Sequence, residues 1–565
     1  MPPRLYRVCW RTFTALLGLA LLLPALAVRA EAPGQGAVAT AHPLASEAGR
    51  EILTTGGNAY DAAIAISAAL AVVEPYGSGI GGGGFFLLRE AGESPRYRFL
   101  DARERAPLAA TPDTYWRDGE VRRDLLLNGP LAAAIPGLPA ALVELAEQHG
   151  RLPLAQSLAP AIRLAHQGFM VDPVYRQRAG WRLAALRDDA ESARLFLLDG
   201  ELPPVGHLLR QPELGETLAR LGAEGRAGFY AGPLAEALVN GVRKAGGIWT
   251  LEDLASYRTV EREPLQFKLR SGQTLISAPP PSAGGLILAQ SLGLLERLDW
   301  HRAGPLEEAH LVIEALRRAY RDRSLLGDPD FVEAPLERLL APDYLDRLAA
   351  SITRQRATPN AELAPGAPWE EPEHTTHFTV MDGDGHAVAA TLSLNFMFGA
   401  AFSVPGTGVV LNNEMDDFAA DISASNAYEL RGSAANAIVG GKRPLSSMSP
   451  TFVEGPDGFA SFGTPGGSRI PSMVLLSVLS HLRGEPPERW VAVPRYHHQY
   501  LPDRVDHEAG SFSAEQASAL EALGHELRPM QRAYGNQQVI HWDKRSGQVE
   551  AASDPRLIGR ALVVD

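Results

Sequence analysis

The sequence predicts an α+β protein whose helices and strands are unevenly divided along the chain. Helical patterns dominate residues 130–330, where prolines and glycines punctuate them. From residue 375 the chain changes to alternating and apolar runs joined by Asp/Gly turns, which is the pattern of strands and hairpins. The proline-containing stretch 355–374 separates these two regions. We therefore expect two structural parts connected by a linker.

Small residues mark the first elements after the leader. The segment "EAGREILTTGGNAYDAAIAISAALAVVEPYG" predicts one helix that ends at Gly56–Gly57 and a second that runs from about Asn58 to just before Pro75. A Gly-Gly pair supplies the left-handed residue that commonly ends a helix, and the alanines of the second helix allow close packing. A glycine-rich loop and an apolar strand follow, and the next strand is expected to end at Arg103.

The stretch 355–374 contains four prolines, little apolar content and no periodicity, so it predicts a mobile linker. Directly after it, "TTHFTVMDGDGHAVAATLSLN" predicts a hairpin that begins at Thr375. An apolar helix is expected over about Ser472–Leu482.

The first thirty residues have the composition of a leader. An apolar stretch, Phe13–Val28, follows a basic region and ends in small residues, with possible cleavage after Ala27 or Ala30. The basic region contains Arg4, Arg7 and Arg11. We expect 1–30 to be a signal peptide that directs export to the periplasm or beyond the cell. The alternative is an uncleaved membrane anchor, because a stretch of this length could almost span a bilayer.

Cysteine content and charge exclude several functions for the mature chain. The single cysteine, Cys9, lies within the leader, so disulfides, thiolate metal sites and a cysteine nucleophile are excluded after cleavage. Removal of 1–30 takes away four arginines and no acids, which changes the net charge from −13 to −17. Nucleic acids and anionic membranes are therefore unexpected partners, since both require clustered cations.

Thr375 stands where a linker meets a core strand, which suits an N-terminal nucleophile. A threonine hydroxyl is a weak nucleophile, and one way to activate it is to make it the first residue of a chain, so that its own α-amine serves as the base. This requires cleavage of the peptide bond before the threonine. The residue pattern alone also allows an ordinary strand residue, because β-branched residues often begin strands.

Ten motifs, in one order over residues 40–560, resemble the gamma-glutamyltransferase (gamma-glutamyltranspeptidase) family. They are "GGNAYDAAIAISAAL", "GSGIGGGGFF", "LDARERAP", "APAIRLAHQGF", "RDRSLLGDPDF", "EHTTHFTVMDGDGHAVAATLSLN", "GVVLNNEMDDF", "KRPLSSMSP", "GTPGGSRI" and "PRYHHQYLPD". The resemblance implies an N-terminal-nucleophile hydrolase fold, an αββα sandwich formed jointly by two subunits. It implies cleavage before Thr375 into a large subunit, 31–374, and a small subunit, 375–565, which stay associated.

The resemblance also implies the reacting groups. Thr375 matches the threonine that cleaves the precursor and then attacks the substrate. Ser393 and Asn395 match polar residues on the return strand of the hairpin. Ser393 stands where the family commonly has threonine, and its hydroxyl can still hydrogen-bond the amine of the nucleophile; Asn395 is implied to bind the substrate. Gly466 and Gly467 match the oxyanion hole, where backbone N–H groups stabilise the tetrahedral intermediate.

The residues implied to bind the substrate's α-amino acid end are spread over three motifs. Arg103 matches the arginine that binds the α-carboxylate, a role for which a planar guanidinium is well suited. Glu414 and Asp417 match the acceptors of the α-ammonium group. Ser446 and Ser447 match serines that also bond the carboxylate.

Each motif has an ordinary alternative when taken alone: a solvent-facing strand residue for Ser393, a solvated acidic turn for Glu414 and Asp417, and a simple turn for the two serines. Arg105 also lies close enough to Arg103 in the sequence to be confused with it.

Tyr428 lies in a segment with the length of the family's lid loop, which favours gamma-glutamyl specificity. No metal or organic cofactor is expected. His374 and His377 would face opposite sides of a strand, which argues against a shared metal.

The implied activity is transfer of gamma-glutamyl groups from glutathione and related amides to water, amino acids or dipeptides through a gamma-glutamyl-threonine ester. One alternative is a related acylase that acts on glutaryl side chains of cephalosporin precursors or on poly-gamma-glutamate. The alternative from another class is a binding protein that keeps the fold without catalysis.

Overall fold

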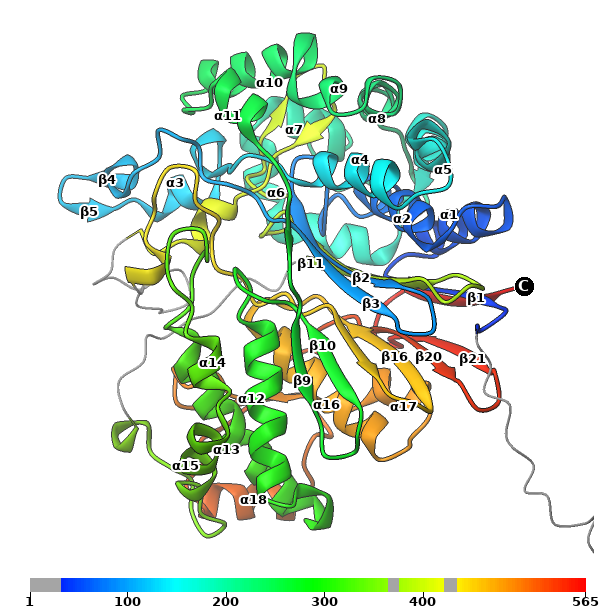
Figure 1. Ribbon diagram of the computed structural model, residues 1–565. Coiled ribbons are helices and arrows are strands. Elements are labelled where there is room, and N and C mark those ends of the chain that lie inside the picture. The colour runs from blue at the N-terminus through cyan, green and yellow to red at the C-terminus, as the bar shows by residue number, and fades with distance from the viewer. Residues whose placement is uncertain (1–31, 364–374, 421–433) are drawn as a thin grey trace, which may run out of the picture.

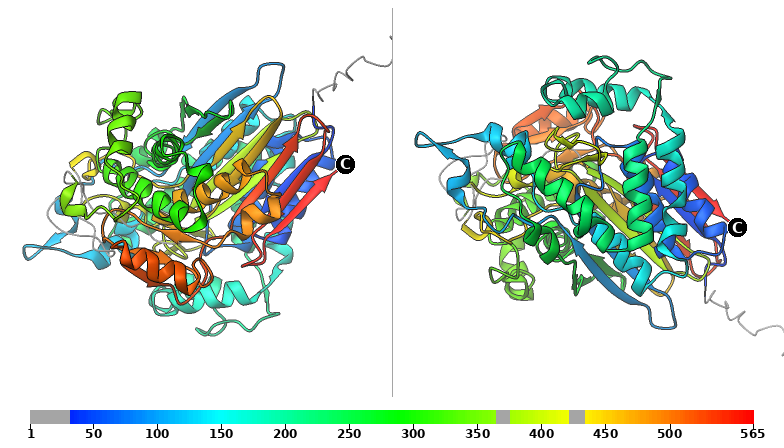
Figure 2. Two further views of the ribbon diagram at one scale, coloured as in Figure 1. Left: turned by 90° about the horizontal axis from the view of Figure 1, so that it is seen from below. Right: turned by 90° about the horizontal axis from the view of Figure 1, so that it is seen from above.

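The computed structural model describes residues 32–363, 375–420 and 434–565. Within these ranges, two large sheets lie face to face, and helices cover the outer face of each (Figure 1). Views from below and above show the same order of layers (Figure 2). The expected αββα sandwich is therefore confirmed.

The first sheet interleaves strands from both sides of residue 375. Its seven strands lie in the order β22 (Arg560–Val564), β1 (Gly36–Thr40), β11 (Thr375–Met381), β12 (Ala387–Ser393), β2 (Gly83–Glu90), β3 (Arg96–Ala102) and β8 (Val260–Arg262). The two strands of the predicted hairpin, β11 and β12, occupy the middle of this sheet, with β1 and β2 hydrogen-bonded on their outer sides. Neither part of the chain can complete the sheet without the other.

The second sheet is shared in the same way. Its six strands lie in the order β21 (Val549–Ser553), β20 (Gln538–Asp543), β16 (Gly458–Gly463), β15 (Thr451–Glu454), β10 (Thr274–Ser277) and β9 (Leu265–Lys268). All neighbouring strands within it are antiparallel.

Side chains of the first sheet alternate between two cores. On β2, Phe85 and Leu87 pack into the core shared with the second sheet, and Phe86 and Leu88 pack into the core beneath the first helix layer. Successive side chains of a strand point to opposite faces, so a strand covered on both faces is apolar at every position. The motif "GGGGFFLL" reflects this double burial.

The first helix layer contains the two helices expected at the start of the chain, α1 (Pro43–Thr54) and α2 (Ala59–Val73). Asn58 caps α2 together with Asp61, and every residue of α2 is buried. The predicted break at Gly56–Gly57 is confirmed. The other helices that pack in or beside this layer are α4 (Leu138–Gln148), α5 (Leu154–Gln167), α6 (Pro173–Asp188), α7 (Ala190–Phe196), α8 (Pro212–Glu224), α9 (Ala227–Tyr230), α10 (Gly232–Lys244) and α11 (Leu251–Ser256).

The second helix layer covers the six-stranded sheet. It contains the expected apolar helix, which is α16 and runs over Ile470–Leu482. The other helices on this side are α12 (Gly284–Arg297), α13 (Pro305–Arg323), α14 (Leu336–Leu339), α15 (Pro342–Ala350), α17 (Pro487–Ala492) and α18 (Ala514–Ala522). No helix in the described ranges combines the length and apolar character needed to cross a membrane.

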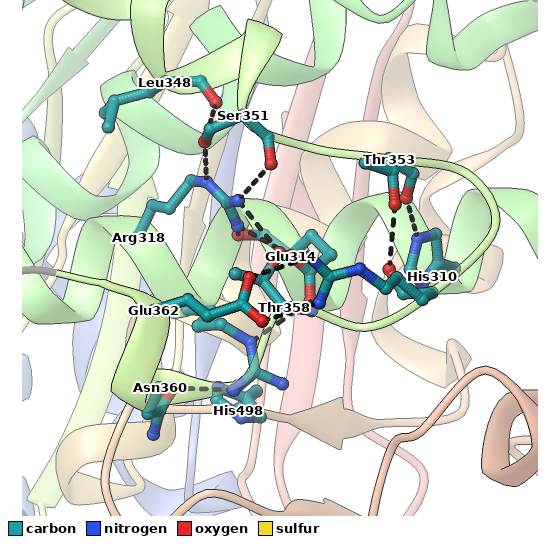
Figure 3. A network of polar contacts seen from close by, with 12 residues as sticks. His310, Glu314, Arg318, Leu348, Ser351, Thr353, Thr358, Asn360, Glu362 and His498 are labelled. Atoms are coloured by element: carbon teal, nitrogen blue, oxygen red, sulfur yellow. Dashed lines mark hydrogen bonds and ion pairs between the residues drawn. The ribbon is translucent and has the colours of Figure 1, made fainter.

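The linker expectation is wrong for residues 355–363, which the structure holds against the second helix layer. The backbone N–H of Thr358 donates to the buried Glu314 Oε1 at 3.0 Å (Figure 3). The N–H of Ala357 donates to the carbonyl of Leu523 at 2.6 Å. Composition alone missed these contacts because their partners lie far away in the sequence. Residues 364–374 lie outside the described ranges.

Candidate active site

Thr375 is the first residue of β11 and lies at an end of the space between the two sheets. In the register of the hairpin it pairs with Ser393 of β12. Two residues further along the strand, the imidazole ring of His377 packs against Gly463 of the second sheet. The two are so close that a Cβ added to Gly463 would lie 2.1 Å from this ring. Because side chains two apart on a strand share a face, Thr375 also points toward the second sheet. Thr376 points the other way, and its hydroxyl donates to Glu74 Oε2 at 2.7 Å.

The loop between β16 and α16 presents a backbone donor to Thr375. The N–H of Gly466 donates to Thr375 Oγ1 at 3.2 Å. Gly466 has φ = 144° and Gly467 has φ = 56°, both in the region that favours glycine. A Cβ at Gly466 would lie 2.5 Å from Met473 Cε, so the close approach of this backbone also depends on the missing side chain.

The return strand of the hairpin connects Thr375 with the second group of predicted residues. Ser393 Oγ accepts the backbone N–H of Asn395 at 2.8 Å, and Asn395 has a left-handed backbone with φ = 68°. The Asn395 side chain donates to the carbonyl of Asn413 at 2.9 Å. This turn links the hairpin that begins at Thr375 to the acidic segment that begins at Glu414.

Arg103, Glu414 and Asp417 meet in one buried cluster although more than 300 positions separate the arginine from the acids. The Arg103 guanidinium donates to Glu414 Oε1 through Nη1 and to Asp417 Oδ2 through Nη2. All three residues are at most 4% exposed. Arg105 lies outside this cluster, since its guanidinium donates to Ser256 Oγ at 2.6 Å. The cluster holds one cation and two anions, the groups needed to bind both ends of a zwitterion.

Ser446 and Ser447 are buried beside this cluster. Arg103 Nε donates to the carbonyl of Pro444 at 3.3 Å, which places the start of the "PLSS" segment against the guanidinium. The hydroxyl of Ser446 accepts the N–H of Met448 at 3.1 Å. Ser447 Oγ accepts from Arg323 Nε at 3.4 Å.

Two further buried acids lie beside the cluster, and sequence reasoning did not single them out. Glu104 Oε2 lies 3.8 Å from Arg103 Nη1, and burial, only partly offset by that arginine, raises the pKa of Glu104 to about 7. Burial likewise raises the pKa of Asp416 to about 6, although Arg123 lies 3.4 Å from it. Glu104 directly follows Arg103 in "LDARERAP", and Asp416 directly precedes Asp417 in "NNEMDDF". Their places beside predicted residues were the signal in the sequence that could have identified them.

Among the residues that the structure describes, no group of three or more His, Cys, Asp or Glu side chains is arranged to hold a metal ion. Tyr428, the predicted lid residue, lies outside the described ranges.

Comparisons with known proteins point to one family. The family model for gamma-glutamyltranspeptidase matches residues 45–564. A glutathione hydrolase proenzyme of Pseudomonas sp. (strain A14) is 41% identical over 513 residues, which cover 88% of this chain and 87% of that protein. The corresponding proenzyme of Escherichia coli (strain K12) is 39% identical over 534 residues, which cover 93% and 91%.

Two solved structures share the fold of this chain. A cephalosporin acylase from Bacillus halodurans superposes with a TM-score of 0.83 at 30% identity and covers 95% of this chain and 96% of that one. Helicobacter pylori gamma-glutamyltranspeptidase superposes with a TM-score of 0.55 at 36% identity and covers 57% and 93%. The fold and the site thus define an enzyme of the N-terminal-nucleophile hydrolase class. Within that class, this chain belongs to the gamma-glutamyltranspeptidase family.

Proposed function

We propose that this chain is a glutathione hydrolase and gamma-glutamyltransferase that cuts itself before Thr375 and uses the freed threonine as its nucleophile. The observation that carries the proposal is the 3.2 Å contact between Gly466 N–H and Thr375 Oγ1 at the start of β11. The hydroxyl already faces a donor suited to an oxyanion. Interleaved strands would keep the products 31–374 and 375–565 together.

The reaction proceeds in two steps. Thr375 Oγ attacks the γ-carbonyl carbon of the donor, the free α-amine of Thr375 accepts the hydroxyl proton, and Gly466 and Gly467 stabilise the oxyanion. The C–N bond then breaks, the leaving amine takes the proton, and a gamma-glutamyl-threonine ester remains. Water or the amine of an amino acid or dipeptide attacks this ester, which releases glutamate or a new gamma-glutamyl amide and regenerates the threonine.

Recognition of the donor follows from the charges of the buried cluster. The substrate's α-carboxylate binds Arg103, Ser446 and Ser447, and its α-ammonium binds Glu414 and Asp417. Without substrate Arg103 pairs with both acids, and the three residues carry one negative charge in excess. A bound zwitterion would pair its carboxylate with the arginine and its ammonium with the two acids. No charge of the cluster is left buried without a partner at either stage.

The similarity to a cephalosporin acylase makes an acylase the second candidate function. A glutaryl group has no ammonium, so it would leave Glu414 and Asp417 without a cationic ligand. We therefore expect gamma-glutamyl-p-nitroanilide to be cleaved at least tenfold faster, in kcat/KM, than its glutaryl analogue, since a hydrogen bond to a charged group contributes roughly this much or more. Equal or reversed rates would favour the acylase.

Self-cleavage is tested on a denaturing gel and by N-terminal sequencing of the smaller fragment. The wild-type protein should give two bands, and the smaller one should begin with Thr375. Thr375→Ala should give one band and no activity, whereas Thr375→Ser, which keeps a hydroxyl, should still cleave. An active protein that stays uncut would refute the proposal.

Export through the leader 1–30, to the periplasm or the medium, is part of the same proposal. A large fragment whose sequence begins near residue 28 or 31 would support it. Retention of residue 1 in the purified enzyme would support the anchor instead.

A further inference from the structure

The loop of residues 464–469, between β16 and α16, contains two adjacent glycines that have no side chains to fix their conformation. Gly466 has φ = 144° and Gly467 has φ = 56°. Glycine has more conformational freedom to lose on folding than any other residue. A backbone donor stabilises an oxyanion well only if it already points the right way before the reaction. Contacts of neighbouring residues therefore have to hold this loop in place.

Ser468, the residue after the two glycines, is held through both its backbone and its side chain. Its carbonyl accepts a hydrogen bond from the Tyr320 hydroxyl of α13. Its Oγ donates to Gln499 Oε1 at 2.9 Å. All three residues are buried, so water does not compete for these two bonds. The end of the glycine pair is thus fixed from two directions.

Gln499 is itself fixed by further hydrogen bonds. Its Nε2 donates to the carbonyl of Leu501 at 3.1 Å, which turns Oε1 toward Ser468. His497 Nε2 lies 2.7 Å from the same Oε1, and His497 Nδ1 lies 2.8 Å from Ser472 Oγ in the first turn of α16. Burial lowers the pKa of His497 to about 3, so its ring is neutral and has a single N–H. Because an amide oxygen only accepts, this N–H is on Nε2 and donates to Gln499.

The hydrogen bond from Tyr320 joins the two parts of the chain that meet at Thr375. Tyr320 lies on α13, before this junction, whereas Ser468 lies after it. The Tyr320 ring also packs edge-on against His497, with the ring centroids 5.4 Å apart. In the proposed two-subunit enzyme, a hydroxyl of the large subunit would therefore help to set the position of a loop of the small subunit.

We propose that Tyr320 and Gln499 are positioning residues, which act through Ser468 to keep the N–H groups of Gly466 and Gly467 aimed at the oxyanion. The inference rests on the proposed function, because it assumes that Thr375 is the nucleophile and that these glycines are the donors. Its consequence is selective. The negative charge on the oxygen exists only during the reaction, so the loss of positioning should slow the chemical steps and leave substrate binding unchanged.

The first test removes the hydroxyl of Tyr320. Tyr320→Phe keeps the ring and should lower kcat for gamma-glutamyl-p-nitroanilide about 10- to 100-fold, since a catalytic group misplaced by about 1 Å can cost about 100-fold. KM should stay within about twofold. The matched control is Tyr60→Phe, because the buried Tyr60 hydroxyl also donates to a carbonyl, that of Arg89, at 2.9 Å. Arg89 lies at the opposite end of β2 from Gly83, the partner of Ser393, so this control should keep the wild-type kcat.

The second test isolates the hydroxyl of Ser468. Ser468→Thr and Ser468→Val add the same volume and have the same shape, and they differ only in whether a hydroxyl remains. Ser468→Thr should therefore have a kcat at least about tenfold higher than Ser468→Val, with similar KM values. Equal kcat values for the two variants would show that the bond to Gln499 does not position the loop.

The third test separates positioning from general damage to the fold. In the boronic acid analogue of glutamate, boron replaces the γ-carbonyl carbon and bonds to Thr375 Oγ as a tetrahedral anion that resembles the transition state. Its Ki should rise in Tyr320→Phe by about the factor by which kcat falls, whereas Ki for glutamate, the product, should stay within about twofold. A lower kcat with an unchanged Ki for the boronic acid would overturn the inference.

Self-cleavage provides a second readout if a variant matures too slowly to be assayed as an enzyme. The comparison of Ser468→Thr with Ser468→Val is then made on the time course of cleavage, where Ser468→Thr should be the faster and equal rates would contradict the inference. An active wild type whose Tyr320→Phe and Ser468→Val variants keep the wild-type kcat would refute the positioning role alone. A wild-type protein that neither cleaves itself nor hydrolyses gamma-glutamyl-p-nitroanilide would instead refute the proposed function.

Discussion

Replacement of Glu314 by glutamine should destabilise the protein strongly, although this residue is not part of the proposed site. Glu314 lies on α13 and is fully buried. Its Oε1 accepts from Thr358 N at 3.0 Å and Arg317 Nε at 3.2 Å, and its Oε2 accepts from Arg318 Nη1 at 2.7 Å (Figure 3). Glutamine keeps the shape, removes the charge and turns an N–H₂ group toward one of these donors.

The magnitude follows from the pKa of Glu314. Burial alone would raise this pKa, but Arg317, Arg318 and the bonds from Thr358 outweigh burial and lower it from 4.5 to about 2. At about 1.4 kcal/mol per pKa unit, the charged form stabilises the fold by about 3 kcal/mol. Loss of one partner of a buried ion pair costs a similar amount, about 3–5 kcal/mol.

The pH dependence of this effect has a definite sign. Because the folded-state pKa is depressed, the stabilisation is fully present above about pH 4.5 and is lost as the pH falls toward 2. The difference between wild type and Glu314→Gln should therefore stay constant from pH 8 to pH 5.

The assay is urea unfolding in a Thr375→Ala background, where the chain stays uncut and unfolding involves one molecule. Glu362→Gln is the control, because Glu362 pairs with Arg356 on the surface of the same segment, and solvent screens such pairs. A loss below about 1 kcal/mol for Glu314→Gln, or a loss equal to that of the control, would refute this reasoning.

Three further predictions concern catalysis and acid stability. Asp417→Asn should raise KM for gamma-glutamyl-p-nitroanilide at least tenfold, because it weakens the acceptor of the α-ammonium; an unchanged KM in steady-state assays would contradict the assigned pocket. Gly466→Ala keeps the backbone N–H but should displace it, because Gly466 has φ = 144° and an added Cβ would lie 2.5 Å from Met473 Cε; kcat should fall by about 10²–10³, the usual effect of losing one oxyanion donor, and self-cleavage should slow on a time-course gel. Normal rates would contradict the steric reasoning. Burial lowers the pKa of five histidines in the described ranges to about 3 or 4, namely His377, His481, His497, His498 and His525. These groups stay neutral in the fold and gain protons when unfolded, so their stabilisation is present above pH 6.5 and is lost below it. Buried acids with raised pKa values act in the opposite direction. Two of them, Glu104 at about 7 and Asp416 at about 6, do so within the range from pH 7 to 5.5, where the five histidines outnumber them. Tm should therefore fall as the pH drops from 7 to 5.5, and a constant Tm would contradict this balance.

Local patterns predicted much of the fold. The double glycine before Asn58, the Asp/Gly turn of the hairpin after Thr375 and the apolar run of α16 all lie where expected. Each depends on turn chemistry or hydrophobic periodicity, which act between near neighbours. The stretch 355–363 was misjudged because its stability comes from side chains that lie on α13 and beyond residue 500.

For the site as well, the sequence determined some features and the tertiary structure determined the others. The sequence by itself determined which residue types are present, that a strand begins at Thr375 and, through ordered motifs, which family the chain resembles. Only the tertiary structure decided that Arg103 contacts Glu414 and Asp417, that Gly466 N–H faces Thr375 Oγ, and that Arg178 and Thr375 line one pocket. The physical reason is that these contacts join segments hundreds of residues apart, whose positions are set by the order of strands in two shared sheets and not by any local preference.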